Sequence, residues 1–250
     1  LDDTFAVIQG DSITDIDISK VLEAHRKNDG KVTICLMEVD EVSQYGIAEM
    51  NGNEIVRFKE KPKKEETFSN LANSGIYILE PEVLDMIPLD FYDFSKNLFP
   101  KMLKEGKKIC GHVANDYWMD IGKPEAYLEA TRHYLNAQNM LAEDCQIDPG
   151  AELEESVLGR GCKIGAGAEV EESVLFDNVE VGEGAEIENS IIGSNCKIGA
   201  GAEVEDSVVG DNVIIGEGAE IGNGARIGPD VEIEAGKKVT GTIVPDKYKD

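Results

Sequence analysis

A carboxylate follows a short run of strand-forming residues near the start of the sequence. Residues 5–8 are apolar, and Gly10-Asp11 comes soon after them with no positively charged residue close by. Open α/β sheets bind their ligands at the carboxyl edge of the strands. The pattern therefore predicts a buried strand over residues 5–8 that delivers the Asp11 carboxylate to a ligand.

The elements that must position such a group alternate between strands and helices over residues 1–140, which is typical of an α/β domain. Apolar residues at helical spacing predict a helix from Ile18 that stops at Gly30. Two alternating runs joined at Asn51-Gly52 predict a hairpin. The other elements expected here are strands over 31–39 and 74–79, a short helix opened by Pro81, and helices over 93–105 and from Pro124 to about residue 138.

After Asp144 the pattern changes to a repeat of 17 residues. The recurring segments are IGAGAEV (164–170), VGEGAEI (181–187), IGAGAEV (198–204) and IGEGAEI (215–221). Between them aliphatic residues recur in steps of six, six and five. A coil with one short strand on each of three faces explains these steps, with one aliphatic side chain per face pointing inward and glycine at the corners. A single coil cannot bury its own core, so we expect about five to stack.

The register of the repeat makes specific predictions about columns of side chains. An interior column is expected from Ile164, Val181, Ile198 and Ile215, and two columns of acids from Glu152, Glu169, Glu186, Glu203 and Glu220 and from Glu154, Glu171, Glu188 and Glu205. Three of the five cysteines, Cys145, Cys162 and Cys196, share one register position and are expected to be packing residues in a reduced protein.

Five motifs of residues 1–140, in order, resemble the sugar-1-phosphate nucleotidyltransferases. They are GD (10–11), YG (45–46), FKEKP (58–62), NSGIY (73–77) and YWMDIGKPEAYL (117–128). The repeat that follows resembles the hexapeptide-repeat left-handed β-helix, and its left hand is expected from that resemblance alone. The fold class implied is a Rossmann-like α/β nucleotidyltransferase domain over residues 1–140, then a left-handed parallel β-helix over residues 141–250.

The resemblance implies that a sugar 1-phosphate attacks the α-phosphorus of an NTP and that pyrophosphate leaves. Its carried-over residues are Asp11 and Asp120 as the pair that holds Mg²⁺, Lys61 at the sugar phosphate, Glu60 and Asn73 at sugar hydroxyls, and Gly46 where the backbone approaches the sugar. Asp11, Lys61 and Asp120 are the expected catalytic residues. From the residues alone, capping or turn roles for Asp11, Asn73 and Asp120, and solvated or ion-paired roles for Lys61 and Glu60, stay open.

The sequence departs from the family at one feature. The family opens with a Gly-rich loop, ending in Thr-Arg-Leu or similar, that wraps the triphosphate, and no such loop occurs here. We therefore expect the first part of the domain to be absent from this chain, and the chain alone to be inactive. Base recognition would lie mostly in the absent part. The motifs look like those of mannose-1-phosphate guanylyltransferases, but glucose-1-phosphate thymidylyl- and uridylyltransferases share nearly all of them.

Composition limits the other classes of function. With 50 acidic and 24 basic residues the net charge is −26, which disfavours nucleic acids and anionic membranes as partners. A hexapeptide acyltransferase is an alternative, but the three histidines (25, 112 and 133) all precede the repeat. A non-catalytic assembly or regulatory subunit is a further alternative. We expect a cytoplasmic homo-oligomer that assembles partly through the β-helix.

Overall fold

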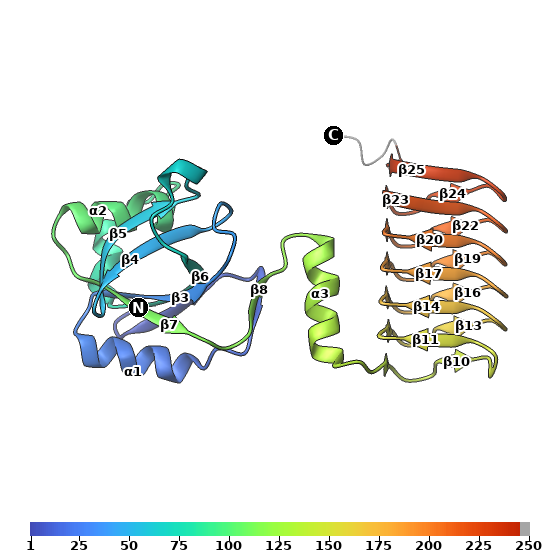
Figure 1. Ribbon diagram of the computed structural model, residues 1–250, viewed down its shortest axis with the longest axis horizontal. Coiled ribbons are helices and arrows are strands. Elements are labelled where there is room, and N and C mark those ends of the chain that lie inside the picture. Colours follow the sequence, from blue (N-terminus) through green and yellow to red (C-terminus); the bar gives the residue numbers. More distant parts are fainter. Residues whose placement is uncertain (246–250) are drawn as a thin grey trace. The chain divides into compact units, whose positions relative to one another are not determined.

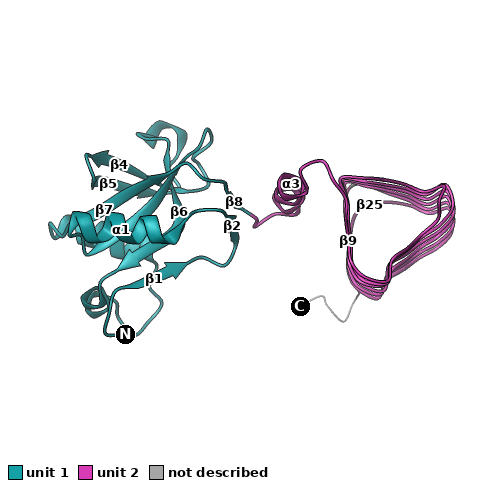
Figure 2. Cartoon of the chain, turned by 90° about the horizontal axis from the view of Figure 1, so that it is seen from below, with its two compact units in different colours: residues 1–120 teal, residues 121–250 magenta. Residues whose placement is uncertain are grey.

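The structure is a computed structural model that describes residues 1–245. The chain forms two compact units, Leu1–Asp120 and a second that begins at Ile121, coloured separately in Figure 2. The predicted domain boundary lies between residues 140 and 141, whereas the compact units divide after Asp120. No helix within residues 1–245 is long and apolar enough to cross a bilayer.

The first unit is built from strands and helices in alternation (Figure 1). Its elements are β1 (Phe5–Ile8), β2 (Ser12–Thr14), α1 (Ile18–Asn28), β3 (Val32–Glu38), β4 (Gly46–Asn51), β5 (Glu54–Glu60), a 3₁₀ turn (Lys64–Glu66), β6 (Leu71–Leu79), a 3₁₀ helix (Pro81–Met86), a π-type turn (Phe94–Leu98), α2 (Phe99–Lys104), β7 (Ile109–Ala114) and β8 (Trp118–Asp120).

Six of these strands form one mixed sheet in the order β1-β6-β3-β7-β5-β4, in which β3 and β7 are parallel. β3 lies in the middle, and both of its faces are buried. Ile34 and Leu36 pack into the core on the α2 side, whereas Cys35 and Met37 pack into the core on the α1 side. The predicted buried strand over 31–39, the helix from Ile18 and the hairpin at Asn51-Gly52 are confirmed.

The strand that precedes Asp11 is not buried as predicted. β1 lies at an edge of the sheet and pairs only with β6, in antiparallel register. Phe5 and Val7 pack against the core, but Ala6 and Ile8 are exposed, Ile8 to 54%. The apolar run was interpreted as a strand covered on both faces, and the structure covers only one.

The helix predicted over residues 93–105 is present from Phe94 to Lys104, but its first turn is of the π type. Asp93 caps a π-type turn over Phe94–Leu98, and its carboxylate accepts a hydrogen bond from the Lys96 amide. The α-helix α2 then starts at Phe99, with Pro100 in its first turn. Proline has no N–H to donate to the preceding turn, so a continuous α-helical ladder cannot pass through this point.

The second unit contains α3 and a stack of coils made of short strands. Its elements are α3 (Pro124–Leu135), β9 (Met140–Leu141), β10 (Gln146–Ile147), β11 (Glu152–Glu154), β12 (Val157–Leu158), β13 (Lys163–Ile164), β14 (Glu169–Glu171), β15 (Val174–Leu175), β16 (Glu180–Val181), β17 (Glu186–Glu188), β18 (Ile191–Ile192), β19 (Lys197–Ile198), β20 (Glu203–Glu205), β21 (Val208–Val209), β22 (Ile214–Ile215), β23 (Glu220–Ile227), β24 (Glu232–Ile233) and β25 (Lys238–Ile243).

The coils form a triangular parallel β-solenoid (Figure 2). One sheet runs β10-β13-β16-β19-β22-β24, which gives six turns where about five were predicted. Ile164, Val181, Ile198 and Ile215 are in register and at most 4% exposed, so the predicted interior column is confirmed. Residues 246–250 of the predicted β-helix domain lie outside the described residues.

Glycine occupies only one of the three corners throughout. Gly167, Gly184, Gly201 and Gly218 have φ between 61° and 65°. At a second corner Asn178, Asn195 and Asn212 adopt the same left-handed conformation, which asparagine tolerates better than most residues. The amide of Asn178 donates to Oδ1 of Asn195 (3.1 Å), and Asn195 donates to Asn212 (3.2 Å). These amides therefore join successive coils.

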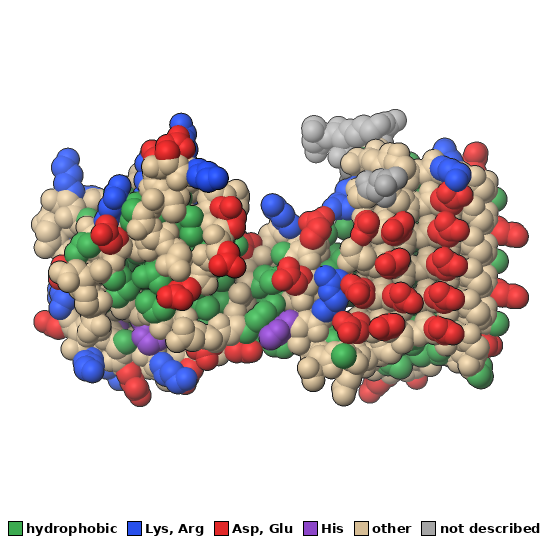
Figure 3. Space-filling model, viewed as in Figure 1, with side chains coloured by type: hydrophobic (Ala, Val, Ile, Leu, Met, Phe, Trp, Pro, Cys, Tyr) green, Lys and Arg blue, Asp and Glu red, His purple; other side chains and the backbone are tan. Residues whose placement is uncertain are grey.

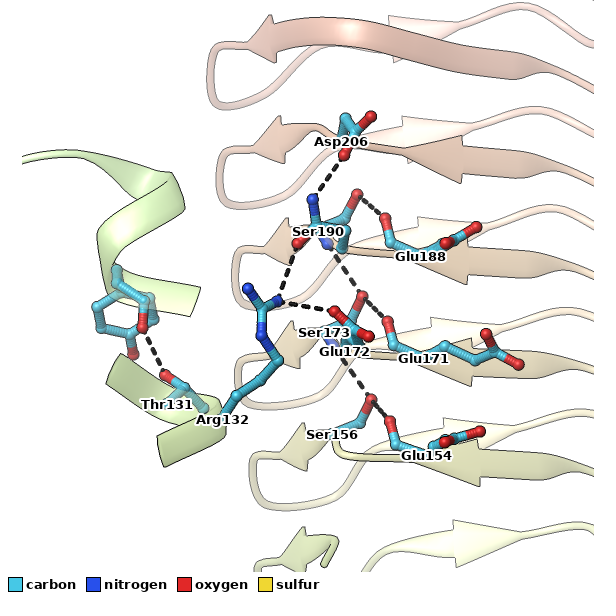
Figure 4. A network of polar contacts seen from close by, with 12 residues as sticks. Thr131, Arg132, Glu154, Ser156, Glu171, Glu172, Ser173, Glu188, Ser190 and Asp206 are labelled. Atoms are coloured by element: carbon cyan, nitrogen blue, oxygen red, sulfur yellow. Dashed lines mark hydrogen bonds and ion pairs between the residues drawn. The ribbon is translucent and has the colours of Figure 1, made fainter. Parts of the chain in front are cut away.

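A column of buried serines also joins the coils (Figure 4). Oγ of Ser173 accepts the backbone N–H of Ser190 at 3.0 Å, and Oγ of Ser190 accepts the N–H of Ser207 at 3.0 Å. Each hydroxyl donates to the carbonyl two residues earlier in its own coil, Glu171 O for Ser173 and Glu188 O for Ser190. The buried serines therefore provide hydrogen-bond partners for backbone N–H and C=O groups that water does not reach.

The helix α3 is attached to the coils of its own unit at two places. Arg132 pairs with Glu172 (2.9 Å), as Figure 4 shows, and donates to Oδ1 of Asn189 in the next coil (3.1 Å). Toward the other end of α3, Glu125 pairs with Arg226 at 2.7 Å. These contacts explain why α3 belongs to the second compact unit.

Acidic side chains form columns across the coils (Figure 3). The strand registers pair Glu152 with Glu169 and Glu154 with Glu171, and the same pairing continues along both predicted columns, which are confirmed. Partial desolvation and the charges of Glu154 and Glu188 raise the pKa of Glu171. In the neighbouring sheet, by contrast, Lys163 and Lys197 lower the pKa of Glu180.

These opposite shifts predict opposite effects of two matched substitutions. Glu171→Gln should raise the melting temperature of the β-solenoid at pH 7 by about 1–2 °C, because it removes repulsion within the column. The raised pKa means that the folded state binds the Glu171 proton more tightly than the unfolded state. The gain should therefore fade as the pH drops through that pKa, and also at high salt.

Glu180→Gln is the matched control and should lower the melting temperature, since it removes a carboxylate held between two lysines. Thermal unfolding followed by circular dichroism at pH 7 and pH 4, at low and high NaCl, measures both effects. Shifts of the same sign for both variants would contradict the interpretation.

The cysteine column has the predicted packing role. Cys162 and Cys196 are buried, Cys145 is half-buried, and all three are free thiols. Sγ of Cys162 lies 3.1 Å from the Phe176 carbonyl, and burial raises the pKa of Cys196 to about 11. A protonated, buried thiol is a small packing residue and a poor nucleophile.

Candidate active site

A cavity in the first unit brings the predicted site residues together. Its volume is about 140 Å³, and its lining is mostly polar. The lining residues are Gln9, Asp11, Ser12, Gln44, Tyr45, Gly46, Glu60, Lys61, Asn73, Ser95, Trp118 and Asp120. All six residues singled out from the sequence, which lie between residues 11 and 120, are among them. Their roles in binding stay predictions.

The two aspartates reach the cavity from neighbouring strands. β2 pairs with β8 so that Ser12 is opposite Asp120, and Asp11 precedes Ser12 in the turn after β1. Asp11 is exposed and makes no hydrogen bond or ion pair with the described residues, so it does not cap a turn. The short β2–β8 ribbon and the turn before it thus bring two carboxylates to the lining of the cavity.

This pair fits Mg²⁺. Within residues 1–245 no group of three or more acidic, histidine or cysteine side chains is arranged to hold a metal on its own. Mg²⁺ does not need such a cage, because it keeps several waters and is commonly bound by one or two carboxylates plus substrate phosphates. Asp11 and Asp120 are the residues that would provide hard oxygen ligands in such an arrangement.

Gly46 and Glu60 are opposite each other in the β4–β5 hairpin. A Cβ atom at Gly46 would lie 2.7 Å from Oε2 of Glu60 and 2.6 Å from Cζ of Phe58, so only glycine leaves the carboxylate where it is. Burial raises the pKa of Glu60, as does Asp93, and Lys61 opposes the shift. The carboxylate therefore sits directly over the Gly46 backbone in a partly desolvated position.

Lys61 follows β5 in the left-handed conformation, with φ of 42°. Its N–H donates to the Tyr45 carbonyl at 2.9 Å, which ties this strained residue to the turn before β4. Strain of this kind persists where the surroundings enforce it, often at functional sites. Lys59 pairs with Glu66 at 2.6 Å, whereas no ion pair of Lys61 exists in the part of the chain that the structure describes. The Lys61 ammonium is thus available at the cavity.

The Asn73 amide is fully committed as a donor inside the protein. Its Nδ2 donates to Tyr77 Oη at 2.9 Å and to Ser95 Oγ at 3.2 Å. Its Oδ1 accepts the Gly75 N–H at 3.0 Å, which leaves one lone pair of that oxygen. Burial raises the pKa of Tyr77 to about 12, so the phenol stays protonated. Any contact of Asn73 with a ligand must use the remaining capacity of Oδ1.

Sequence reasoning assigned no role to several lining residues, among them Ser95 and Trp118. Trp118 Nε1 donates to the Ser74 carbonyl at 2.9 Å, and its ring lies edge-on to Tyr45 with centroids 5.3 Å apart. Burial, followed by the Asp120 charge, raises the pKa of Tyr45. Both aromatics lay within the quoted motifs, but Ser95 lies outside them, and no local signal identified it.

Comparison with known families agrees with this geometry. Residues 1–137 match the family model described as nucleotidyl transferase. The chain belongs to the nucleotidyl transferase family. The C-terminal part of the chain also matches two models, the GMPPB C-terminal domain over residues 135–218 and the bacterial transferase hexapeptide (six repeats) over residues 206–241. The predicted fold class is thereby confirmed as a nucleotidyltransferase domain followed by a parallel β-solenoid.

Curated relatives of the chain include enzymes for different sugars. A UTP–glucose-1-phosphate uridylyltransferase of Synechocystis sp. is 37% identical over 60% of this chain and 40% of its own length. A probable mannose-1-phosphate guanylyltransferase 3 of Arabidopsis thaliana is 38% identical over 53% of this chain and 40% of its own length. A mannose-1-phosphate guanyltransferase of Kluyveromyces lactis is 39% identical over 53% and 37%. The chain spans about two fifths of the length of these relatives.

Proposed function

We propose that this chain provides the sugar 1-phosphate and metal site of an enzyme that transfers a nucleotidyl group from an NTP to a sugar 1-phosphate. The product is an NDP-sugar, and pyrophosphate leaves. The observation that carries the proposal is the single polar cavity in which Asp11, Asp120, Lys61, Glu60 and Asn73 meet. Such chemistry depends on positioned phosphates and neutralised charge more than on a nucleophilic side chain.

Each residue has a role that follows from its position. Lys61 offers an unpaired ammonium to the sugar phosphate, and Glu60 accepts a hydrogen bond from a sugar hydroxyl that lies over the Gly46 backbone. Asn73 uses Oδ1 for a second hydroxyl. Asp11 and Asp120 hold Mg²⁺, which when bound neutralises phosphate charge.

Mannose 1-phosphate with GTP is the substrate pair we favour. The GMPPB C-terminal domain match and the guanylyltransferase relatives support it. Glucose 1-phosphate with UTP or dTTP is the alternative, and the uridylyltransferase relative supports it. We further propose a cytoplasmic homo-oligomer, assembled partly through the β-solenoid.

Pyrophosphate release from the full-length gene product tests the proposal. The assay compares GTP with mannose 1-phosphate, and UTP or dTTP with glucose 1-phosphate, each with Mg²⁺ and with EDTA. We expect one pair to dominate and EDTA to abolish turnover. Binding of sugar 1-phosphate without turnover on any pair would indicate a non-catalytic subunit, and consumption of acetyl-CoA would indicate an acyltransferase.

Gly46→Ala should weaken sugar 1-phosphate binding by about tenfold or more. The new methyl group must displace the Glu60 carboxylate or the Phe58 ring, because both lie within 2.7 Å of its position. A hydrogen bond to a charged group is worth about 1.5–3 kcal/mol, and about 1.4 kcal/mol corresponds to tenfold in affinity. Isothermal titration with mannose 1-phosphate and glucose 1-phosphate measures the change.

Gly222→Ala is the matched control, since nothing lies within 4 Å of a Cβ at that position in the solenoid. It should bind sugar 1-phosphate like the unmodified chain. Unchanged affinity in Gly46→Ala, with the protein folded, would remove Glu60 from the proposed sugar contact.

A further inference from the structure

Ser95 lines the cavity from an element that none of the sequence motifs covers. It lies in the π-type turn Phe94–Leu98 and is 9% exposed. A buried hydroxyl needs hydrogen-bond partners, because an unsatisfied one costs free energy. The partners of this hydroxyl are two of the residues proposed to contact the sugar.

On one side Ser95 meets Asn73, and on the other it meets Glu60. Oγ of Ser95 accepts a hydrogen bond from Asn73 Nδ2 at 3.2 Å. Glu60 lines the same cavity as Ser95, and the Ser95 hydroxyl lowers the pKa of Glu60 against the effect of burial. Tyr77 also reaches this network, through Asn73 and through Ser95 itself. The Ser95 hydroxyl is therefore hydrogen-bonded to Asn73 of β6 and lines the same cavity as the Glu60 carboxylate of β5.

Aromatic packing holds the turn that carries Ser95 in place. Phe94 lies next to Tyr77, with ring centroids 5.7 Å apart, and next to Phe99 at 6.0 Å. Phe99 in turn contacts Tyr77 at 5.3 Å and Phe58 at 5.4 Å. These rings connect β5, β6 and the start of α2. A side chain on so constrained a turn is suited to fix the positions of others.

We propose that Ser95 is a positioning residue that holds the Glu60 carboxylate and the Asn73 amide as one hydrogen-bonding surface for adjacent hydroxyls of the sugar ring. This inference rests on the proposed function. Glu60 and the free lone pair of Asn73 Oδ1 are both acceptors, so the surface selects two neighbouring O–H donors. A sugar that lacks one of these hydroxyls would leave one acceptor unpaired, and unpaired buried polar groups discriminate strongly.

The groups around Glu60 determine in which direction its pKa should change when the Ser95 hydroxyl is removed. Asp93, in the cap of the turn, raises the pKa of Glu60, whereas Lys61 and Lys96 lower it. Removal of the Ser95 hydroxyl takes away a hydrogen bond to the charged form, so the pKa of Glu60 must rise. A change that only loosened packing around the turn would not by itself produce this rise.

The experiment compares the unmodified chain with Ser95→Ala and with Ser95→Cys, which is near in size and only a weak donor. Ser19→Ala, at an exposed position on α1 away from the cavity, is the matched control. The first readout is the pKa of Glu60 from NMR titration of ¹³C-labelled glutamate. The second is the affinity for mannose 1-phosphate, glucose 1-phosphate and their 2-deoxy analogues.

We expect Ser95→Ala to raise the pKa of Glu60, to weaken sugar 1-phosphate binding about tenfold, and to reduce the discrimination against the deoxy analogues. Ser95→Cys should be intermediate, and Ser19→Ala unchanged. An unchanged Glu60 pKa, or a raised pKa with unchanged affinity, would overturn the inference. Absence of binding in the unmodified chain would instead overturn the proposed function. If Ser95→Ala fails to fold, the same comparisons with Ser95→Cys decide.

Discussion

Replacement of Asp11 or Asp120 by asparagine should lower the rate of nucleotidyl transfer by about 100-fold or more, and Asp11→Asn should leave folding almost unchanged. Both carboxylates line the cavity, at the end formed by the β2–β8 ribbon. Asparagine keeps the shape of aspartate but removes the charge, and losing one electrostatic contact to a transition state commonly costs about 10²–10³ in rate. Asp11 is exposed, so its loss should change stability by no more than about 0.5 kcal/mol.

Pyrophosphate release by the full-length gene product, at several Mg²⁺ concentrations, measures this effect, with thermal unfolding as the test of stability. Asp40→Asn, at an exposed position outside the cavity lining, is the control and should be fully active. Full activity of Asp11→Asn at low Mg²⁺ would refute the assignment of the metal pair.

Ile198→Ala should destabilise the β-solenoid by about 2–5 kcal/mol. Ile198 is 3% exposed and lies in the middle of the interior column, between Val181 and Ile215. The coils above and below are fixed by backbone pairing, so they cannot collapse into the space, and the full cost of a cavity applies. Chemical denaturation followed by circular dichroism measures the loss.

Ile214→Ala is the matched control, since this neighbouring isoleucine is 44% exposed on the outer surface of the same sheet. It should cost well under half as much. Equal losses at the two positions would mean that the column does not form the core of the solenoid.

The solenoid was the part of the fold that the sequence predicted best, because each coil pairs with the coil next to it in the sequence. An interval of 17 residues fixes which side chains stack, and the strand registers follow that interval from coil to coil. The assignment of the corners was less complete. Gly167 marked its corner in the sequence, but Asn178 and Glu172 adopt left-handed conformations that nothing in the spacing required.

The α/β unit was predicted less well, because the position of a strand in a sheet depends on distant residues. The four apolar residues of β1 do not indicate whether one or both faces of the strand are covered. Here β1 lies at the edge of the sheet and pairs only with β6. The helix over 93–105 had helical periodicity throughout, and the π-type turn before Pro100 reflects the N–H that proline lacks.

For the site, the sequence identified residues that lie at one cavity but not how they are connected. Asn73 was expected to offer its side chain to a ligand, yet both of its amide protons are used within the protein. Ser95 could not be identified from the sequence, because a single serine outside a motif forms no recognisable pattern with other residues. Hydrogen bonds between residues that are 20 or more positions apart in the sequence become visible only in the three-dimensional structure.

Two residues of the helix α3 contact coils that are a fixed number of repeats apart. Glu125 and Arg132 lie about 10 Å apart along its axis, since an α-helix rises about 1.5 Å per residue, and coils repeat at about 4.8 Å. Arg132 reaches Glu172 and Asn189, whereas Glu125 reaches Arg226 about two to three coils further on. Insertion or loss of a whole coil between these points would preserve every column in the solenoid and still separate one end of α3 from its partner. The number of coils between Glu172 and Arg226 is thus matched to the spacing of Arg132 and Glu125 on a helix that lies outside the coils.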